Sequence, residues 1–383
     1  MNFLPNPIEL YENETLESAL LRLCRANHFE HYNDLSIEIR SWLEEHHPTI
    51  AGAFPLALDA VNVYHSKQSS AKRVQSLQLL EQLVGLPKFS LLDVSFKHTN
   101  AVDSGHFAEV RYKQITIPKS FVRACNVPVC IECLRESNYV RFDWHISKVT
   151  CCDKHKVKLL TNCPSCNTTL NYMISEDPSR CVCGYSLFGV DSSEAGIDGW
   201  RRWPSFDQQG KQPFSEQLAM LFFLDRHFPK LGHEEFNDDL KGHIEGHLQK
   251  LIDHSLLIAT DKINRLTFSY LTNNFLSDVA QISCLPDCIK ESIASVVIEL
   301  ALETPRSTIA NLGDSLVSIR EVALITGSTV EDIFRLYESG ILMLGKRIRD
   351  EGRLESFNPA FRLRDVAAIV LSYSRYGYSQ SAW

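Results

Sequence analysis

The residues best suited to chemistry in this chain are its cysteines, because nine of the twelve lie between residues 125 and 183. Six of the nine form close pairs with one or two residues between the partners: Cys130 and Cys133, Cys163 and Cys166, Cys181 and Cys183. Two thiolates at this spacing can sit on one turn, and a second pair brought across by a hairpin completes a tetrahedral zinc site. The spacing therefore predicts metal binding.

The first predicted site combines three cysteines with one histidine. Cys130 and Cys133 are followed, after eighteen intervening residues, by Cys152 and His155. Cys151 is the alternative ligand to Cys152, and would lengthen the spacing to the histidine by one residue. We favour Cys152 because it keeps the tighter two-residue knuckle on both sides of the site.

The second predicted site consists of four cysteines. Cys163 and Cys166 are followed, after fourteen intervening residues, by Cys181 and Cys183. Gly184 comes directly after them, and a glycine can supply the positive φ that such a turn often needs. We expect both sites to hold zinc, so that the chain carries two zinc ions.

Four cysteines remain outside these two sites, namely Cys24, Cys125, Cys284 and Cys288. We expect them to be small buried apolar side chains, which is how free cysteine usually behaves. Cys284 and Cys288 could alternatively pair on one face of a helix, because three residues separate them.

The ligand sets of the two sites predict that the metal has a structural role and does not take part in catalysis. Four protein ligands leave no open position for water or a substrate. The only metalloprotease-like pattern is His243-Ile-Glu-Gly-His247, in which the glutamate lies one position too late to face a metal-bound water. We expect a solvated or partly buried histidine pair there. No phosphate-binding loop is present either, so we predict that the protein is not an enzyme.

Composition narrows the class of protein further. The formal net charge is -8, with 39 Lys and Arg residues against 47 Asp and Glu residues. This balance argues against binding DNA mainly by neutralising phosphates, so a nucleic-acid contact would be local or borrowed from a partner. No apolar run of about 18 residues and no signal-peptide pattern occurs, and we therefore expect a cytoplasmic protein without a membrane segment. In that reducing compartment clustered cysteines favour metal binding over disulfides.

Apolar periodicity predicts a mainly α fold in four parts. Residues 1–115 form a helical N-terminal domain that begins with an amphipathic helix over residues 14–29. Residues 116–190 form the double zinc-binding segment, with short β-hairpins. Residues 191–310 form a helical region after a loop-like start, and residues 311–383 form a C-terminal region like a helix-turn-helix.

The C-terminal pattern raises the question of DNA contact. Residues 319–341 predict two helices separated by a turn at 326–329, as in a helix-turn-helix. Glu331 and Asp332 make the second helix a poor reader of a groove lined with phosphates. The candidate DNA-binding residues are Arg335, Lys346, Arg347 and Arg349. The alternative, protein docking or a purely structural role, stays open.

Two stretches resemble one known family. Modest matches lie near the N-terminus, at Pro5, Pro7, Glu14, Leu16, Ser18, Arg22, Leu23 and Asn27. More specific matches lie in the central segment, at Cys130, Cys133, Leu134, Glu136, Tyr139, Trp144, Cys152, His155, Leu159, Cys163 and Cys166. Through them the chain resembles the TniQ/TnsD family of transposition target-selection proteins over about its first half. The Cys181 and Cys183 pair departs from the family's two-residue spacing.

The resemblance implies a non-catalytic targeting adaptor for DNA transposition. With 383 residues and an acidic net charge, the chain resembles the short TniQ branch. Members of that branch dock on a type I CRISPR Cascade complex with its guide RNA. That branch recruits a TnsC-like AAA+ regulator, forms a homodimer and contacts target DNA mostly indirectly. The alternative implied by longer family members is a selector that binds an attachment-site sequence itself.

Overall fold

The computed structural model describes residues 4–65, 71–99, 108–191, 213–231, 239–259, 274–303, 311–345 and 354–375. It groups the chain into two compact units, Met1–Trp203 and Pro204–Trp383. Within the described residues helices predominate over short strands, which confirms the mainly α prediction. The division into four parts at residues 115, 190 and 310 stays a prediction.

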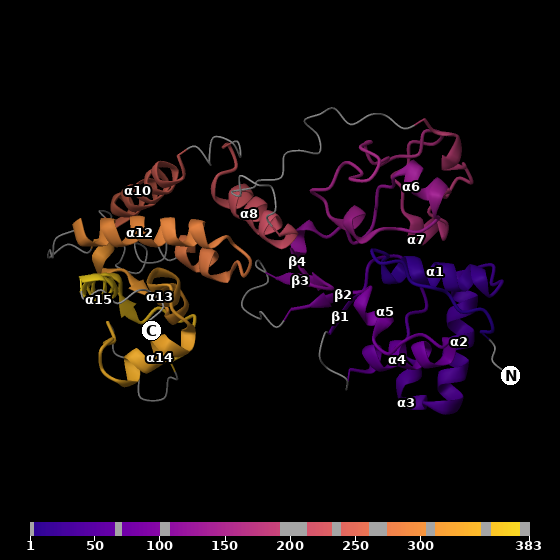
Figure 1. The fold of residues 1–383 in the computed structure, drawn as a ribbon, viewed down its shortest axis with the longest axis horizontal. Helices are drawn as coiled ribbons and strands as arrows, with labels where there is room; N and C mark the ends of the chain where they lie inside the picture. Colours follow the sequence, from indigo (N-terminus) through magenta and orange to yellow (C-terminus); the bar gives the residue numbers. More distant parts are fainter. Residues whose placement is uncertain are drawn as a thin grey trace. The chain divides into compact units, whose positions relative to one another are not determined.

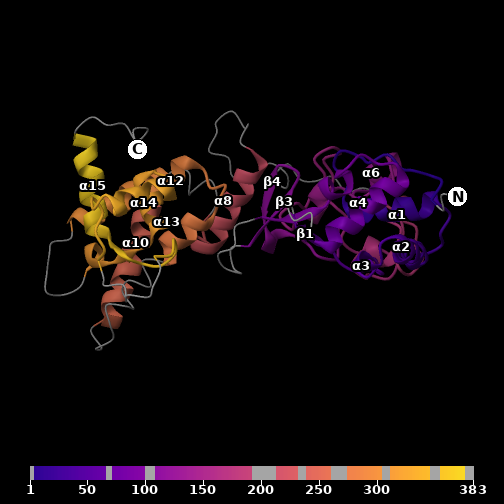
Figure 2. The same ribbon diagram turned by 90° about the horizontal axis from the view of Figure 1, so that it is seen from below.

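The N-terminal unit begins with helices that pack in chain order (Figures 1 and 2). They are α1 (Leu16–Ala26), α2 (Tyr32–His46), α3 (Pro48–Ala51), α4 (Lys72–Val84) and α5 (Ser90–Asp93). Each contacts the next along the chain. In α1 the apolar residues Leu16, Leu20 and Leu23 recur at helical spacing and are buried, so burial of this face holds the helix in place.

The N-terminal unit also contains a four-stranded sheet, which apolar periodicity did not predict and whose first strand precedes α4 in the chain. Its strands are β1 (Val63–His65), β2 (Phe96–His98), β3 (Glu109–Tyr112) and β4 (Ile115–Pro118), in that spatial order. β1 pairs with β2 in parallel, and the other neighbours are antiparallel. Strands of three or four residues show too little alternation to be recognised from sequence. The first 115 residues therefore contain strands as well as the predicted helices.

The cysteine-rich segment is built from short turns. Its helical pieces are η1 (Lys119–Phe121), α6 (Ile131–Glu136), η2 (Phe142–His145), α7 (Tyr172–Ser175) and η3 (Leu187–Gly189). Its strands are reduced to isolated antiparallel bridges, such as Val129 with Leu160 and Asn162 with Thr169. Its fold thus depends on tight turns and on the residues that hold those turns together.

The described residues of the C-terminal unit are mostly helical. Its elements are α8 (Phe214–His227), α10 (Leu240–Ala259), a helical stretch at 274–281, α12 (Asp287–Glu303), η4 (Leu312–Asp314), β5 (Leu316–Val317), α13 (Ile319–Thr326), α14 (Val330–Glu338), β6 (Phe361–Arg362) and α15 (Leu363–Arg375). α12 lies at the centre and contacts α10, α13 and α15. No helix in the described part of the chain is both long and apolar enough to cross a membrane.

Candidate metal centres

The first cluster is formed by a short helix and a hairpin. Cys130 caps the N-terminus of α6, and Cys133 lies inside that helix. Cys152 and His155 lie on a tight turn, in which the Cys152 N–H donates to Val157 O at 2.8 Å and the Lys156 N–H donates to Cys152 O at 2.9 Å. The turn presents the thiol and the imidazole to the same side, toward α6.

The ligand atoms of this cluster lie at the separations that a zinc tetrahedron requires. Cys133 Sγ is 3.3 Å from His155 Nδ1 and 3.6 Å from Cys152 Sγ, and Cys130 Sγ is 3.5 Å from His155 Nδ1. A zinc ion with bonds of about 2.3 Å to sulfur places neighbouring ligand atoms about 3.8 Å apart. All four atoms lie within 4.8 Å of one another, and three of the four residues are buried. The donor set therefore fits zinc.

Glu136 supports the histidine ligand, a role that the sequence analysis did not assign. Its Oε1 lies 3.0 Å from His155 Nε2, the ring nitrogen that faces away from the cluster. Its other carboxylate oxygen pairs with Lys154. Hydrogen bonds from Lys154 and then from His155 lower the pKa of Glu136. A carboxylate behind a histidine ligand fixes the ring orientation and tautomer, so that Nδ1 is left to bind the metal.

Cys152, and not Cys151, is the third cysteine of this cluster. Cys151 is buried but lies outside it, with its Sγ 3.7 Å from Thr150 Oγ1. The preference for Cys152 from spacing agrees with this geometry. Cys24 is buried as expected. The same expectation is wrong for Cys125, which lies on a surface bend, and for Cys288, which lies on an exposed position in the first turn of α12; Cys284 is half-buried.

The second cluster brings together the other four predicted ligands. Cys163 Sγ is 3.8 Å from Cys183 Sγ, and Cys166 Sγ is 3.6 Å from Cys181 Sγ. Gly184 has a φ of 85°, the left-handed conformation that glycine was expected to supply. These separations also match the edges of a zinc tetrahedron of thiolates. The one-residue spacing of the last pair is therefore compatible with the site.

The ligands of the second cluster are more exposed than those of the first. Cys163 and Cys181 are buried, whereas Cys166 and Cys183 are exposed. Hydrogen bonding with Thr168, whose Oγ1 lies 3.3 Å from the sulfur, lowers the pKa of the Cys166 thiol to about 6. A lowered pKa favours the thiolate, which is the form that binds metal.

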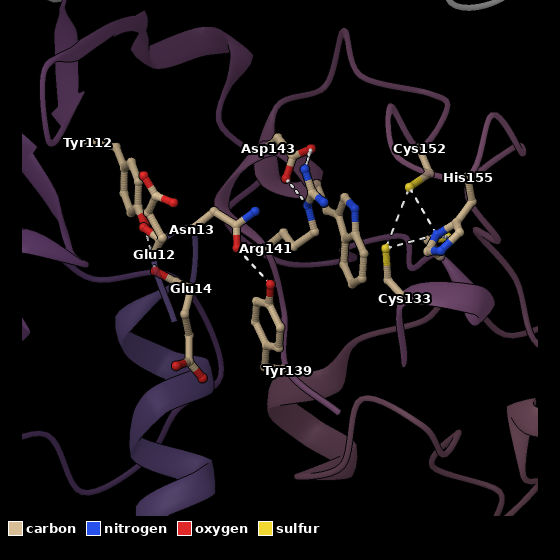
Figure 3. A network of polar contacts seen from close by, with 12 residues as sticks. Glu12, Asn13, Glu14, Tyr112, Cys133, Tyr139, Arg141, Asp143, Cys152 and His155 are labelled. Atoms are coloured by element: carbon tan, nitrogen blue, oxygen red, sulfur yellow. Dashed lines mark hydrogen bonds and ion pairs between the residues drawn. The ribbon is translucent and has the colours of Figure 1, made fainter. Parts of the chain in front are cut away.

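A polar network joins α1 to the segment that carries the first cluster (Figure 3). Glu14 is fully buried, and its carboxylate accepts from Arg22 Nη1 at 2.6 Å and from Ser18 Oγ at 2.9 Å. The Ser18 hydroxyl in turn accepts from the Val140 N–H at 2.9 Å. The Tyr139 hydroxyl donates to Asn13 Oδ1 at 2.7 Å. Glu14, Ser18, Arg22 and Tyr139, which carry the resemblance to the family, therefore contribute to the contacts between the start of α1 and the segment that contains the first cluster.

Figure 3 also shows an ion pair, which lies between the Asn13–Tyr139 contact and the cysteines of the first cluster. Arg141 Nε lies 3.0 Å from Asp143 Oδ1, and both side chains are mostly buried. Nearby, the Arg123 guanidinium donates to the carbonyl oxygens of Trp144, Ile146 and Ser147 at 2.6–3.0 Å. Burial lowers the pKa of Arg123. These contacts satisfy carbonyl groups that the irregular backbone cannot pair within a helix or sheet.

The predicted DNA-binding residues are not brought together by the described structure. α13 and α14 are joined through Gly327, which has a φ of 68°, and Thr329 caps α14. Arg335 is exposed on α14 and forms an ion pair with Asp332 at 3.1 Å. Lys346, Arg347 and Arg349 lie outside the described residues. Their role in DNA contact stays a prediction.

The histidine pair on α10 does not form a metal site with other described residues. His247 packs against the rings of His227, Phe228 and Phe275. Burial lowers the pKa of His247, and it lowers that of His227 to about 3. The described residues hold only the two cysteine-containing groups as possible metal clusters. Both histidines are half-buried, which agrees with the expectation of a partly buried pair.

Comparison with protein families gives one match. The family model described as TniQ matches residues 7–159. The match includes the network around Glu14 and all four residues of the first cluster, and it ends before the second cluster begins at Cys163. No curated protein sequence matches the chain.

Proposed function

Because residues 7–159 belong to the TniQ family, we propose that the protein is a non-catalytic targeting adaptor for DNA transposition. The TniQ domain supports a role in transposition-associated target selection. The adaptor function, its partners and its metal are our extension of that role.

The observation that carries the proposal is the pairing of a TniQ domain with two closed ligand sets. Each set offers four protein ligands and all four atoms of each lie within 4.8 Å of one another. Such a set leaves a bound zinc ion without an open position for substrate. We therefore assign both clusters to structural zinc, with two ions per chain. The metal would supply cross-links between turns, while the protein's residues supply the contacts with partners.

The proposed partners are a Cascade complex with its guide RNA and a TnsC-like AAA+ regulator of transposition. The chain would dock on the first and recruit the second, so that the transposase is directed to the site that the guide RNA selects. The formal charge of -8 supports docking on a ribonucleoprotein. RNA-binding proteins present basic surfaces, and complementary charge speeds and orients association.

We further propose that the protein acts in the cytoplasm as a homodimer. A two-fold assembly would repeat each contact and present two equivalent surfaces to the larger complex. Light scattering on the purified protein tests this, with a mass close to twice the 43.6 kDa of one chain as the expected result.

Co-purification tests the adaptor function directly. The protein is expressed with Cascade, with and without guide RNA, and we expect recovery of a stoichiometric complex only when the guide RNA is present. The alternative is a selector that reads an attachment site itself. Its signature would be a protein that ignores Cascade yet shifts one defined duplex with nanomolar affinity at moderate salt. Deletion of residues 311–383 should then abolish the shift.

A further inference from the structure

The second cluster joins two loops, and each loop contributes one buried and one exposed cysteine. Cys163 is 1% exposed and Cys181 is 5% exposed, whereas Cys166 and Cys183 belong to the exposed residues. The sulfurs approach each other across the loops: Cys166 Sγ lies 3.6 Å from Cys181 Sγ, and Cys183 Sγ lies 3.8 Å from Cys163 Sγ. Each close pair therefore combines a cysteine that solvent reaches with a buried one.

These pairs have the arrangement that disulfide formation needs. A disulfide holds its sulfurs about 2.0 Å apart, so the sulfurs of each pair have to approach by less than about 2 Å. Oxidation of cysteine starts at an accessible thiolate, and it ends in a disulfide when a second thiol lies within reach. The cluster thus holds two pairs, each with an accessible thiol and a neighbour that can complete the disulfide.

The first cluster offers a comparison with the same separation of sulfurs but without the access. Cys133 Sγ lies 3.6 Å from Cys152 Sγ, as close as the sulfurs of the second cluster. However, Cys130 and Cys152 are 0% exposed and Cys133 is 7% exposed. An oxidant dissolved in water therefore meets the thiols of the second cluster more readily than those of the first.

Each loop of the second cluster keeps its shape through its own backbone hydrogen bonds. The Cys163 N–H donates to Thr168 O at 2.9 Å, and the Cys181 N–H donates to Tyr185 O at 3.0 Å. These bonds do not involve the sulfurs. The loops can therefore keep their conformation when the link between them changes from a metal ion to disulfides.

We propose that the second cluster is an oxidant-responsive site, at which a hydroperoxide converts the four thiolates into two disulfides between the loops and releases the bound zinc ion. First, Cys166 Sγ attacks the terminal peroxide oxygen and the O–O bond breaks. With uptake of one proton, this step gives a sulfenic acid and one molecule of alcohol or water. Cys181 Sγ then attacks the sulfur of Cys166, and the hydroxyl group leaves as water with a second proton. Cys183 and Cys163 react in the same way with a second hydroperoxide molecule.

The oxidation exchanges one cross-link for another. Each pair loses two electrons, which reduce one hydroperoxide molecule, and the disulfide sulfurs are no longer the thiolates that bind zinc. The loops stay joined while the metal leaves, and a thiol reductant together with zinc reverses the change. This inference does not depend on docking to Cascade, because it concerns the purified chain alone.

The test treats the full-length protein, loaded with zinc, with hydrogen peroxide. The starting protein is the double variant Cys125→Ser with Cys288→Ser, which lacks the exposed cysteines outside the two clusters. A chromogenic chelator follows the release of zinc. Alkylation of the remaining thiols and tryptic digestion then locate the disulfides.

Trypsin separates the two loops, because it cleaves after Lys158 and after Arg180. The cysteines of the first loop fall in the peptide 159–180, and those of the second loop fall in the peptide that follows. A disulfide between the loops therefore holds the two peptides together, whereas a disulfide within one loop leaves them apart.

We expect one zinc ion per chain to be released at least ten times faster than the other, together with the cross-linked pair of peptides. Cys130, Cys133 and Cys152 should still react with the alkylating reagent, and the far-UV spectrum should be retained. A thiol reductant with added zinc should restore the original metal content.

Three results would overturn the inference: release of both ions at the same rate, disulfides confined within one loop, or oxidation that a thiol reductant does not reverse. Thiols of the second cluster that stay unoxidised in peroxide would overturn it as well. If the purified protein contains fewer than two zinc ions, the peptide map still decides, because it reports the disulfides independently of the metal.

Discussion

The two metal clusters offer similar ligands but differ in their surroundings. In the first, three ligands are buried and Glu136 supports the histidine. The adjacent segment of the same chain is also hydrogen-bonded to α1, through Val140 and Ser18. In the second, two of the four ligands are exposed, and the ligand-bearing stretches 161–175 and 181–190 contain no charged residue. The difference indicates that the first cluster is part of the core of the segment that matches the TniQ model, whereas the second holds a more exposed segment in shape.

The largest expected effect is loss of a ligand from the first cluster. Cys133→Ser should give aggregated protein, because zinc binding in such segments contributes on the order of 10 kcal/mol, comparable with the whole stability of a domain. The measurement is soluble yield together with far-UV circular dichroism. Cys151→Ser is the matched control, since that thiol is buried and directly precedes the ligand Cys152 in the sequence, yet lies outside the cluster. A soluble, folded Cys133→Ser protein would show that the core does not depend on this metal.

The next effect concerns a buried carboxyl on α1. Glu17 is 1% exposed, its Oε1 accepts from the Asn62 N–H at 2.9 Å, and burial raises its pKa from 4.5 to about 7. The folded state therefore holds this proton more tightly than the unfolded state, and the carboxyl reduces stability progressively as the pH rises from about 4.5 to about 7.

Glu17→Gln keeps the side chain neutral at every pH. The variant should match the wild type near pH 4.5 and exceed it at pH 8 by up to about 3 kcal/mol. Urea unfolding at the two pH values measures the difference, with Glu38→Gln on the exposed face of α2 as the control. Equal stability of Glu17→Gln and wild type at pH 8 would rule out this burial cost.

Loss of a ligand from the second cluster should be milder. Cys183→Ser is expected to release one zinc ion and to lower the melting temperature by a few degrees, because few buried contacts depend on this exposed residue. The TniQ domain should stay folded. Differential scanning calorimetry with metal analysis tests this. Aggregation as severe as that of Cys133→Ser would remove the proposed distinction between the clusters.

The smallest effect on stability is expected at Glu136, which touches a ligand but not the metal. Glu136→Gln should lower zinc affinity about 10- to 100-fold through loss of the carboxylate behind His155. The fold should persist in excess zinc. Competition with a chromogenic chelator gives the affinity, and Glu132→Gln, on the same helix α6, is the control. An unchanged affinity would mean that Glu136 serves only its ion pair with Lys154.

Local spacing was enough to predict the eight residues of the two clusters. Ligands two residues apart are fixed by a single turn, so sequence carries that information. The carboxylate of Glu136 and the buried pair of Glu14 with Arg22 depend on contacts between distant segments, which spacing cannot reveal. The resemblance to a family marked these residues but could not say what they contact.

The sheet and the exposed cysteines illustrate the same limit. Strands β1 to β4 have three or four residues each, and β1 pairs with β2 although α4 and α5 separate these two strands in the sequence. Burial of Cys125 and Cys288 was expected from residue type alone, and it is wrong because Cys125 lies on a surface bend and Cys288 on the exposed side of the first turn of α12. The helices, in contrast, were recognisable because apolar periodicity over several turns is a local signal.

The most direct test of this account is the zinc content of the purified protein before and after brief treatment with a mild chelator. We expect two zinc ions per chain, of which the one at the exposed second cluster is lost first, while the helical far-UV spectrum is retained. A folded protein that contains one zinc ion or none before treatment, or that loses both ions together with its fold, would contradict it.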